Sequence, residues 1–191
     1  YIPSLGDNMA LALSLAHVTN NIEFGTSISP IYHRTARDYA QTAAYIHEVS
    51  NGRFRFGFGV SHEAALAQWG MAGGKPLSDI RSFVNGLREA PRVGELPPLV
   101  LATLRKKMIQ LSAQIGDGMV FANAARSHVP DSLSVLPQDL ASHFFIGNMI
   151  PTCISDDVEA AKAVNRRTLS SYLFLPNYRN YWKEAGYEED M

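Results

Sequence analysis

Residues 22–60 constrain the fold of this chain most, because two runs of β-forming residues flank one amphipathic segment. The runs cover residues 22–28 and 53–60, and apolar residues recur between them at three- and four-residue steps. Side chains alternate across a strand, so the phenylalanines of the second run share one face while Gly57 and Gly59 share the other. We predict a βαβ unit in which one strand face packs and the other lets a ligand or another backbone approach closely.

The alternation of strand and helix continues along the chain. Apolar runs predict strands at 22–28, 53–60, 99–102, 119–122 and about 144–147. Helical periodicity predicts helices at about 8–17, 34–49, 77–87, 108–115 and 155–169, with a helical or loop crossover at 127–140. Asp7 or Asn8 is expected to cap the first helix, and Ser155 or Asp156 the last. Such alternation predicts parallel strands with right-handed crossovers, either in an open doubly wound sheet or in part of a barrel.

The composition fits one globular domain over residues 1–191, because 46% of the residues are hydrophobic and can bury a substantial core. A net charge of −1, from 17 basic and 18 acidic residues, disfavours nucleic acid as a partner. No apolar run reaches the length of a membrane span. Cys153 cannot form an internal disulfide, and without a signal-peptide pattern we expect a cytoplasmic protein. The start at Tyr1 instead of Met suggests a fragment or a processed chain.

Several segments in one order resemble a known family. Residues 19–28 (TNNIEFGTSI) are followed by Arg34, a helix and residues 49–62 (VSNGRFRFGFGVSH), and residues 96–102 and 115–120 match the next two strands. This pattern resembles the bacterial luciferase-like family of flavin- or deazaflavin-dependent oxidoreductases. The resemblance implies an α/β fold of TIM-barrel type, of which the sequence contains the third to the seventh strand. We therefore expect an incomplete barrel whose open sheet edges need cover, which favours a homo-oligomer.

The resemblance also implies a cofactor site at the carboxyl ends of the strands. A bulge that often contains a non-prolyl cis peptide supports the cofactor ring in this family, and Ser27-Ile28 matches its position. The hydroxyls of Thr26 and Ser27 are expected to bond the ring edge. Without the resemblance, residues 25–29 would read as an ordinary strand end.

Two further segments complete the expected cofactor site. After the second strand, small residues and backbone amides are expected to meet a polar or anionic group: Gly57, Gly59, Val60, Ser61 and His62. His62 either contacts the cofactor or substrate, or serves only as a local hydrogen-bonding residue. Ala102, Thr103 and Leu104 precede a helix whose first amides attract phosphate. The basic residues 105–107 either add positive charge there or form a solvated helix face.

The resemblance implies hydride transfer to or from a small organic substrate, with monooxygenation as the less favoured reaction. The cofactor that it implies is a deazaflavin coenzyme or FMN, and the loop at 70–76 resembles deazaflavin-dependent members. The protein groups bind and orient the cofactor, which performs the redox step itself. No catalytic acid or base is assigned, and the histidines lack metal-ligand spacing.

Two other functions stay open at this point. The first is a non-catalytic flavin-binding or assembly protein that dimerises through its open sheet edges, and the second is an open-sheet domain for another phosphorylated ligand. The aromatic residues within 177–182 are expected to close a barrel end or an interface in preference to stacking on a cofactor ring.

Overall fold

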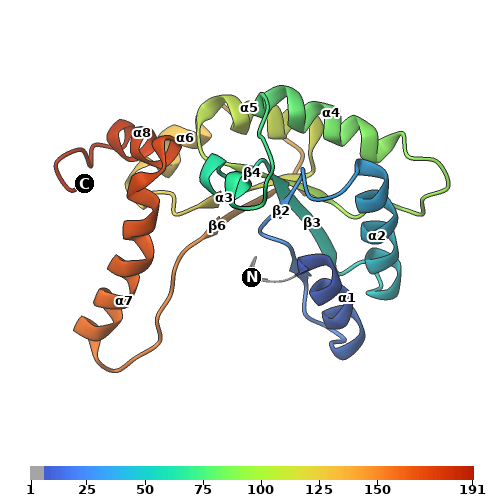
Figure 1. The fold of residues 1–191 in the computed structure, drawn as a ribbon, viewed down its shortest axis with the longest axis horizontal. Helices are drawn as coiled ribbons and strands as arrows, with labels where there is room; N and C mark the ends of the chain where they lie inside the picture. The colour runs from blue at the N-terminus through green and yellow to red at the C-terminus, as the bar shows by residue number, and fades with distance from the viewer. Residues whose placement is uncertain (1–6) are drawn as a thin grey trace.

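The computed structural model describes residues 7–191 as a half-barrel of parallel strands flanked by helices (Figure 1). The sheet order is β1-β3-β4-β5-β6, and β2 pairs with β3 on the same side as β1. The strands are β1 (Phe24–Gly25), β2 (Ser29–Pro30), β3 (Phe54–Gly59), β4 (Leu99–Thr103), β5 (Gly118–Ala122) and β6 (Phe145–Met149). The order along the sheet follows the order along the chain, as right-handed β/α crossovers produce in a barrel.

The helices that the structure describes are α1 (Asn8–Val18), α2 (Ala36–Val49), α3 (Glu63–Gln68), α4 (Pro76–Arg88), α5 (Lys106–Ile115), α6 (Val129–Leu133), α7 (Val158–Ser170) and α8 (Pro176–Glu184), with short 3-10 helices η1 (Arg126–His128) and η2 (Ser171–Phe174). Five of these helices match those predicted from the apolar patterns, whereas α3 and α8 were not predicted. In Figure 1, α4 and α5 run along the outer side of the sheet, while α1 and α7 lie at opposite ends of its inner side. Within residues 7–191, no helix is long and apolar enough to cross a membrane.

Helix caps explain two boundaries. Asp7 caps α1 as predicted, since its Oδ1 accepts hydrogen bonds from the amides of Met9 and Ala10 at 3.0 and 3.2 Å. The predicted cap of α7, Ser155 or Asp156, is wrong. Asp157 caps this helix through the Ala160 amide at 2.9 Å, while the Ser155 hydroxyl accepts the Asp157 amide and shapes the preceding turn.

The predicted strand at 22–28 is two short strands separated by a bulge. Phe24 pairs with Phe54, whereas Ser29 pairs with Phe58, so one extra residue lies on the β1–β2 side. The Ser27-Ile28 peptide bond within the bulge is cis, as the resemblance implied. Between β1 and β2, the Thr26 side chain forms hydrogen bonds to the backbone of β3, where a regular strand would use its own backbone groups.

The core lies between the sheet and its outer helices. Phe54, Phe56 and Phe58 are fully buried, and the ring of Phe56 packs 5.4 Å from that of Tyr39 on α2. Phe83 on α4 lies 5.2 Å from Phe58. The predicted phenylalanine face therefore forms the packed side of β3, which leaves the glycine face on the inner side of the half-barrel.

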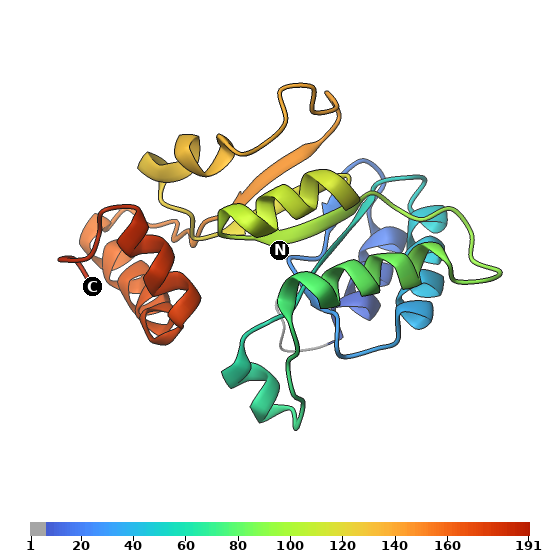
Figure 2. The ribbon, with the colours of Figure 1, turned by 90° about the horizontal axis from the view of Figure 1, so that it is seen from above.

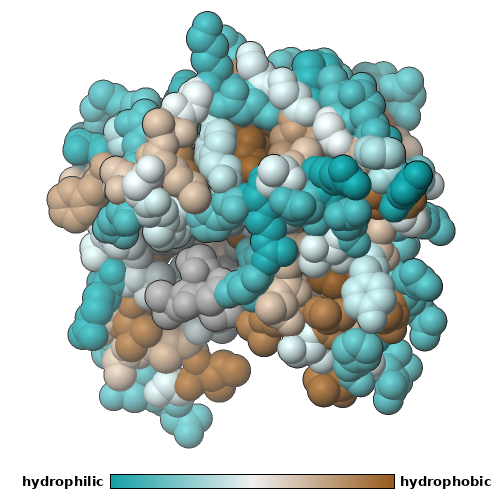
Figure 3. All heavy atoms as spheres, turned by 45° about the vertical axis from the view of Figure 1, so that its right-hand side comes forward, coloured by the Kyte–Doolittle hydropathy of each residue, from teal (hydrophilic) through white to brown (hydrophobic). Residues whose placement is uncertain are grey.

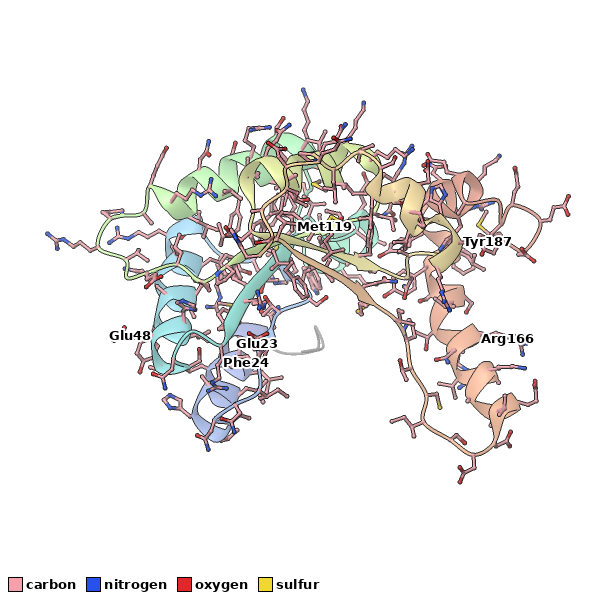
Figure 4. The ribbon with its side chains drawn as sticks, turned by 180° about the vertical axis from the view of Figure 1, so that it is seen from behind. Glu23, Phe24, Glu48, Met119, Arg166 and Tyr187 are labelled. Atoms are coloured by element: carbon pink, nitrogen blue, oxygen red, sulfur yellow. The ribbon has the colours of Figure 1, made fainter. Side chains whose placement is uncertain are left out.

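The inner side of the sheet is partly open to solvent. Arg55 projects there from β3, where its guanidinium lies 5.2 Å from the centre of the Phe145 ring and pairs with Glu23 at 3.1 Å. Phe145 itself remains 37% exposed. Figure 4 shows Glu23 and Arg166 on opposite sides of this inner face and Met119 near the centre of the sheet. The edges of the half-barrel are thus separated, as an incomplete barrel requires.

Candidate functional site

The candidate site lies at the carboxyl edge of the sheet, where parallel strands bring the segments that follow them together. The bulge at 26–28, the turn at 60–62 and the start of α5 all lie at this edge. The β2–β3 and β3–β4 pairings, Ser29 with Phe58 and Phe58 with Leu101, place the three segments beside one another. Residues far apart in the sequence therefore form one continuous surface.

The bulge is fixed by hydrogen bonds from both sides. The Thr26 hydroxyl donates to the Gly57 carbonyl oxygen at 2.6 Å and accepts the Gly57 amide at 3.0 Å. On the other side, Asn8 of α1 donates to the Ile28 carbonyl oxygen at 3.2 Å. The Thr26 hydroxyl is therefore committed to β3, whereas Ser27 and Ile28 are half-buried at the surface of the site.

The two glycines of β3 make room for the chain itself. A Cβ on residue 57 would lie 1.9 Å from the Thr26 carbonyl oxygen, so only glycine lets the bulge close onto β3. A Cβ on residue 59 would lie 2.8 Å from the Ala102 Cβ and 3.4 Å from Ile28 Cδ1. The sequence predicted that a ligand or another backbone approaches this face closely. At Gly57 the structure shows another backbone, that of Thr26, whereas at Gly59 the side chains of Ile28 and Ala102 lie closest.

The turn after β3 places His62 at the edge of the site. Val60 is half-buried, and Ser61 turns the chain with a left-handed φ of 62°. His62 directly precedes α3, a short helix that the apolar pattern did not predict. Of its six residues only Leu66 is buried. Burial lowers the pKa of His62, so its imidazole is neutral at pH 7. Its ring lies 5.5 Å from that of Tyr178 in an edge-on arrangement.

The start of α5 combines free helix amides with an unpaired hydroxyl. Arg105 occupies the cap position without a side-chain hydrogen bond to the first turn. Within residues 7–191, the buried Thr103 Oγ1 has no hydrogen-bond partner. A helix start of this kind favours an anion, and the Thr103 hydroxyl can donate to one. Ala102 and Leu104, on either side of Thr103, are half-buried.

The basic residues at this helix start are largely neutralised by acidic partners. Arg105 pairs with Glu184 at 2.6 Å, and Lys106 pairs with Asp131 at 2.9 Å. In the described part of the chain, Lys107 has no such partner among the ion pairs. The positive potential at α5 therefore comes from its backbone amides and Lys107 more than from the full basic run.

Asn123 is a further polar residue at this edge, and the sequence analysis missed it. It follows β5 in a left-handed conformation with φ of 58° and is 7% exposed. In the part of the chain that the structure describes, neither its Nδ2 nor its Oδ1 has a hydrogen-bond partner. The available signal was an amide side chain directly after the buried run 119–122.

Two recesses of the surface lie at the opposite edge of the sheet. One is lined by Asp117 and His143 near the start of β5, and the other by His47 and Glu95 near the start of β3. Because ligands of parallel α/β folds bind at the carboxyl ends of strands, we do not assign these recesses to the candidate site.

The comparisons with known proteins decide the family. The sequence model for luciferase-like monooxygenases matches residues 2–191. The chain belongs to this family. It is 28% identical over 137 residues to the 5,10-methylenetetrahydromethanopterin reductase of Archaeoglobus fulgidus, a match that covers 61% of this chain and 40% of the reductase. This luciferase-like chain therefore spans less than half the length of that curated relative.

Solved structures share the fold of this luciferase-like chain. An F420-dependent secondary alcohol dehydrogenase in complex with an F420–acetone adduct matches with a TM-score of 0.71 at 17% identity, over 88% of this chain and 62% of that one. The oxygenating constituent of 3,6-diketocamphane monooxygenase from Pseudomonas putida, in complex with FMN, matches with a TM-score of 0.67 at 14% identity, over 98% of this chain and 65% of that one. The predicted fold, a partial TIM barrel, is confirmed.

The residues of the candidate site fit a flavin-type group. The uncapped start of α5 and the unpaired Thr103 hydroxyl suit a phosphate, and the half-buried Ile28 and Ala102 provide an apolar surface beside them. A flavin-type cofactor joins an apolar ring system to a phosphate-bearing arm, so both kinds of surface are needed side by side.

Proposed function

We propose that this chain binds a deazaflavin coenzyme or FMN at the carboxyl edge of its sheet and takes part in hydride transfer on a small organic substrate. One observation supports this proposal most: in a chain of the luciferase-like family, the bulge, the His62 turn and the start of α5 share one edge. The bound cofactor supplies the hydride chemistry, and the protein binds and orients it.

Each segment has a distinct part in the proposed site. Ser27 and Ile28 support the ring from the bulge, with Ala102 completing the apolar surface. Thr103 and the first amides of α5 hold the phosphate. His62, neutral through burial, offers an uncharged imidazole to the cofactor or substrate. The deazaflavin is preferred to FMN because the matched curated relative is a methylenetetrahydromethanopterin reductase and the loop at 70–76 resembles deazaflavin-dependent members.

Titration of the purified chain with FMN and, separately, with the deazaflavin tests this function by absorbance and fluorescence. Gly59→Val is expected to abolish binding, because its side chain must displace Ile28 or Ala102 from the proposed ring surface. Gly94→Val is the matched control, since a Cβ at residue 94 meets only Ala44 at 3.8 Å. Folded protein that binds neither cofactor would refute the proposal.

A second titration isolates the phosphate position. Thr103→Val keeps the shape of the side chain but removes its hydroxyl, so we expect weaker binding of FMN and unchanged binding of riboflavin, which lacks the phosphate. A charge-assisted hydrogen bond is worth about 1.5–3 kcal/mol, which corresponds to roughly a tenfold to hundredfold change in Kd. Equal losses for the two ligands would place the phosphate elsewhere.

An alternative function is supported by the open inner face and edge. Phe145, Ile146 and Ile150 are 37%, 43% and 65% exposed in and beside the edge strand β6. Exposed apolar residues on an edge strand favour pairing with another chain. We therefore keep a non-catalytic partial barrel that assembles through this edge as the second candidate. Sedimentation of the purified chain as a dimer, without any bound cofactor, would favour it over the oxidoreductase.

A further inference from the structure

Helix α8 contacts the His62 turn of the proposed site through an aromatic ring. Tyr178 packs edge-on against His62, with ring centroids 5.5 Å apart, although 115 residues of chain separate them. Tyr178 is 5% exposed, because Tyr172 and Trp182 pack against it at 4.7 and 5.6 Å. His62 therefore lies between its own turn and an aromatic cluster of Tyr172, Tyr178 and Trp182.

The same helix contacts the two neighbouring strand ends. Trp182 Nε1 donates to the backbone oxygen of Asn123, after β5, at 3.2 Å. Glu184 pairs with Arg105, after β4, at 2.6 Å. Together with the contact to His62 after β3, these bonds place α8 across three successive strand ends (Figure 2 shows α8 beside this end of the sheet).

We propose that α8 forms one wall of the cofactor site and that Tyr178 is the positioning residue that holds the His62 imidazole at that site. This inference rests on the proposed function, since the wall has a role only if a flavin-type cofactor binds at this edge. It goes further by making the C-terminal segment, which contributes none of the cofactor-binding residues expected from the sequence, a requirement for binding.

The contact between Tyr178 and His62 depends on the ring more than on the hydroxyl. An edge-on pair of aromatic rings gains from the ring quadrupole, and a phenylalanine at 178 would keep it. Burial lowers the pKa of His62, and no charged group contributes to that shift among the described residues. Removing the ring should therefore hydrate His62 and return its pKa toward 6.5, the ordinary value.

Three variants test the proposal, with cofactor Kd and the NMR titration of the His62 imidazole as readouts. We expect Tyr178→Ala to weaken cofactor binding by at least tenfold and to raise the pKa of His62. Tyr178→Phe should restore both to the wild-type values. Phe174→Ala is the matched control, because this aromatic residue of the neighbouring η2 is 84% exposed and should leave both readouts unchanged.

The outcomes separate this inference from the proposed function. Wild-type affinity in Tyr178→Ala, or failure of Tyr178→Phe to restore binding, would overturn the role of Tyr178 while leaving the cofactor site in place. Absence of binding to the wild-type chain would refute the proposed function, and with it the wall. If circular dichroism shows that Tyr178→Ala does not fold, Trp182→Phe replaces it, since this change keeps a ring and removes the bond to Asn123. Wild-type cofactor affinity in that variant would overturn the wall.

Discussion

Gly57→Ala should destabilise the fold more than any other single-methyl addition to β3. The added Cβ would lie 1.9 Å from the Thr26 carbonyl oxygen, and the backbone fixes the positions of both atoms, so neither can rotate away. The bulge and β3 must therefore separate by more than 1 Å, roughly the difference from normal van der Waals contact. This separation also breaks the two hydrogen bonds between Thr26 and the Gly57 backbone, at 2.6 and 3.0 Å.

The magnitude follows from these two losses. Overpacking in a closed core costs about 1–3 kcal/mol. Two buried hydrogen bonds contribute about 1 kcal/mol each. We therefore expect the free energy of unfolding to fall by about 3–5 kcal/mol, which for a chain of this length corresponds to roughly 10 °C in Tm.

Urea unfolding followed by circular dichroism measures this change, with Gly94→Ala as the control. A Cβ at residue 94 makes only an ordinary contact of 3.8 Å with Ala44, so its effect should stay within about 0.5 kcal/mol. If Gly57→Ala were as stable as Gly94→Ala, the close packing of the bulge on β3 would be refuted, and with it the placement of Ser27 and Ile28.

Three further predictions concern stability and pH. Arg53→Met should lower the free energy of unfolding in urea by about 3 kcal/mol, because it removes a network of hydrogen bonds. The Arg53 guanidinium donates to the carbonyls of Ala16, Thr19, Ile22 and Ser50 and to the Thr19 hydroxyl. An unchanged unfolding midpoint would contradict that network. Tyr39→Phe should lower the free energy of unfolding by about 1–2 kcal/mol in the same assay, because the buried Tyr39 hydroxyl donates to the Pro30 carbonyl at 2.8 Å. Stability equal to that of the wild type would show that this hydrogen bond contributes nothing. Burial lowers the pKa of His62, so the unfolded chain binds the proton more tightly than the folded chain does. The free energy of unfolding should therefore decrease as the pH falls from about 7 through 6.5 toward the folded-state pKa. His62→Gln should flatten this part of the stability–pH profile, and a profile identical to that of the wild type would refute the shift.

The fold was largely predictable because its signals are local. The glycine and phenylalanine alternation of residues 54–59 identified β3 and its packed face, and the start of α1 was predicted to within one residue, with Asp7 or Asn8 as its cap. The cap of α7 was assigned to the wrong residue because Ser155, Asp156 and Asp157 are adjacent and all suit the position. Sequence spacing cannot choose between neighbouring capping residues, whereas the turn geometry does.

The candidate site was predictable only in part, because some of its contacts join distant segments. The segments at 26–28, 57–62 and 102–104 came from family resemblance and from the rule that parallel strands end at one edge. The contacts of Arg105 with Glu184 and of Trp182 with Asn123 cross 79 and 59 residues of chain, and no local pattern announces either. The carboxamide of Asn123 is buried and has no hydrogen-bond partner among residues 7–191, and this likewise cannot be recognised before α8 is placed beside it.

Exposed hydrophobic side chains lie on the open inner side of the molecule, Phe145 among them. On the face that Figure 3 shows, hydrophobic side chains lie among hydrophilic ones over the lower part of the molecule. In α7, none of the residues is buried, and Val158 and Val164 of its predicted apolar side are 60% and 46% exposed. The helix forms where it was predicted, but its predicted apolar side is not buried within residues 7–191.

Hydrogen exchange can decide whether another chain covers this side. In an isolated chain, β6 pairs only with β5 and has no buried residue, so its amides should exchange much faster than those of β3 and β4, which are paired on both sides. The amides of α7 should exchange as fast as those of β6, while α8 should be slower because Tyr178 and Tyr181 are buried. Slow exchange in β6 that becomes fast on dilution would contradict the isolated half-barrel. It would instead support assembly through the edge strand, because only a partner that dissociates on dilution makes protection depend on concentration.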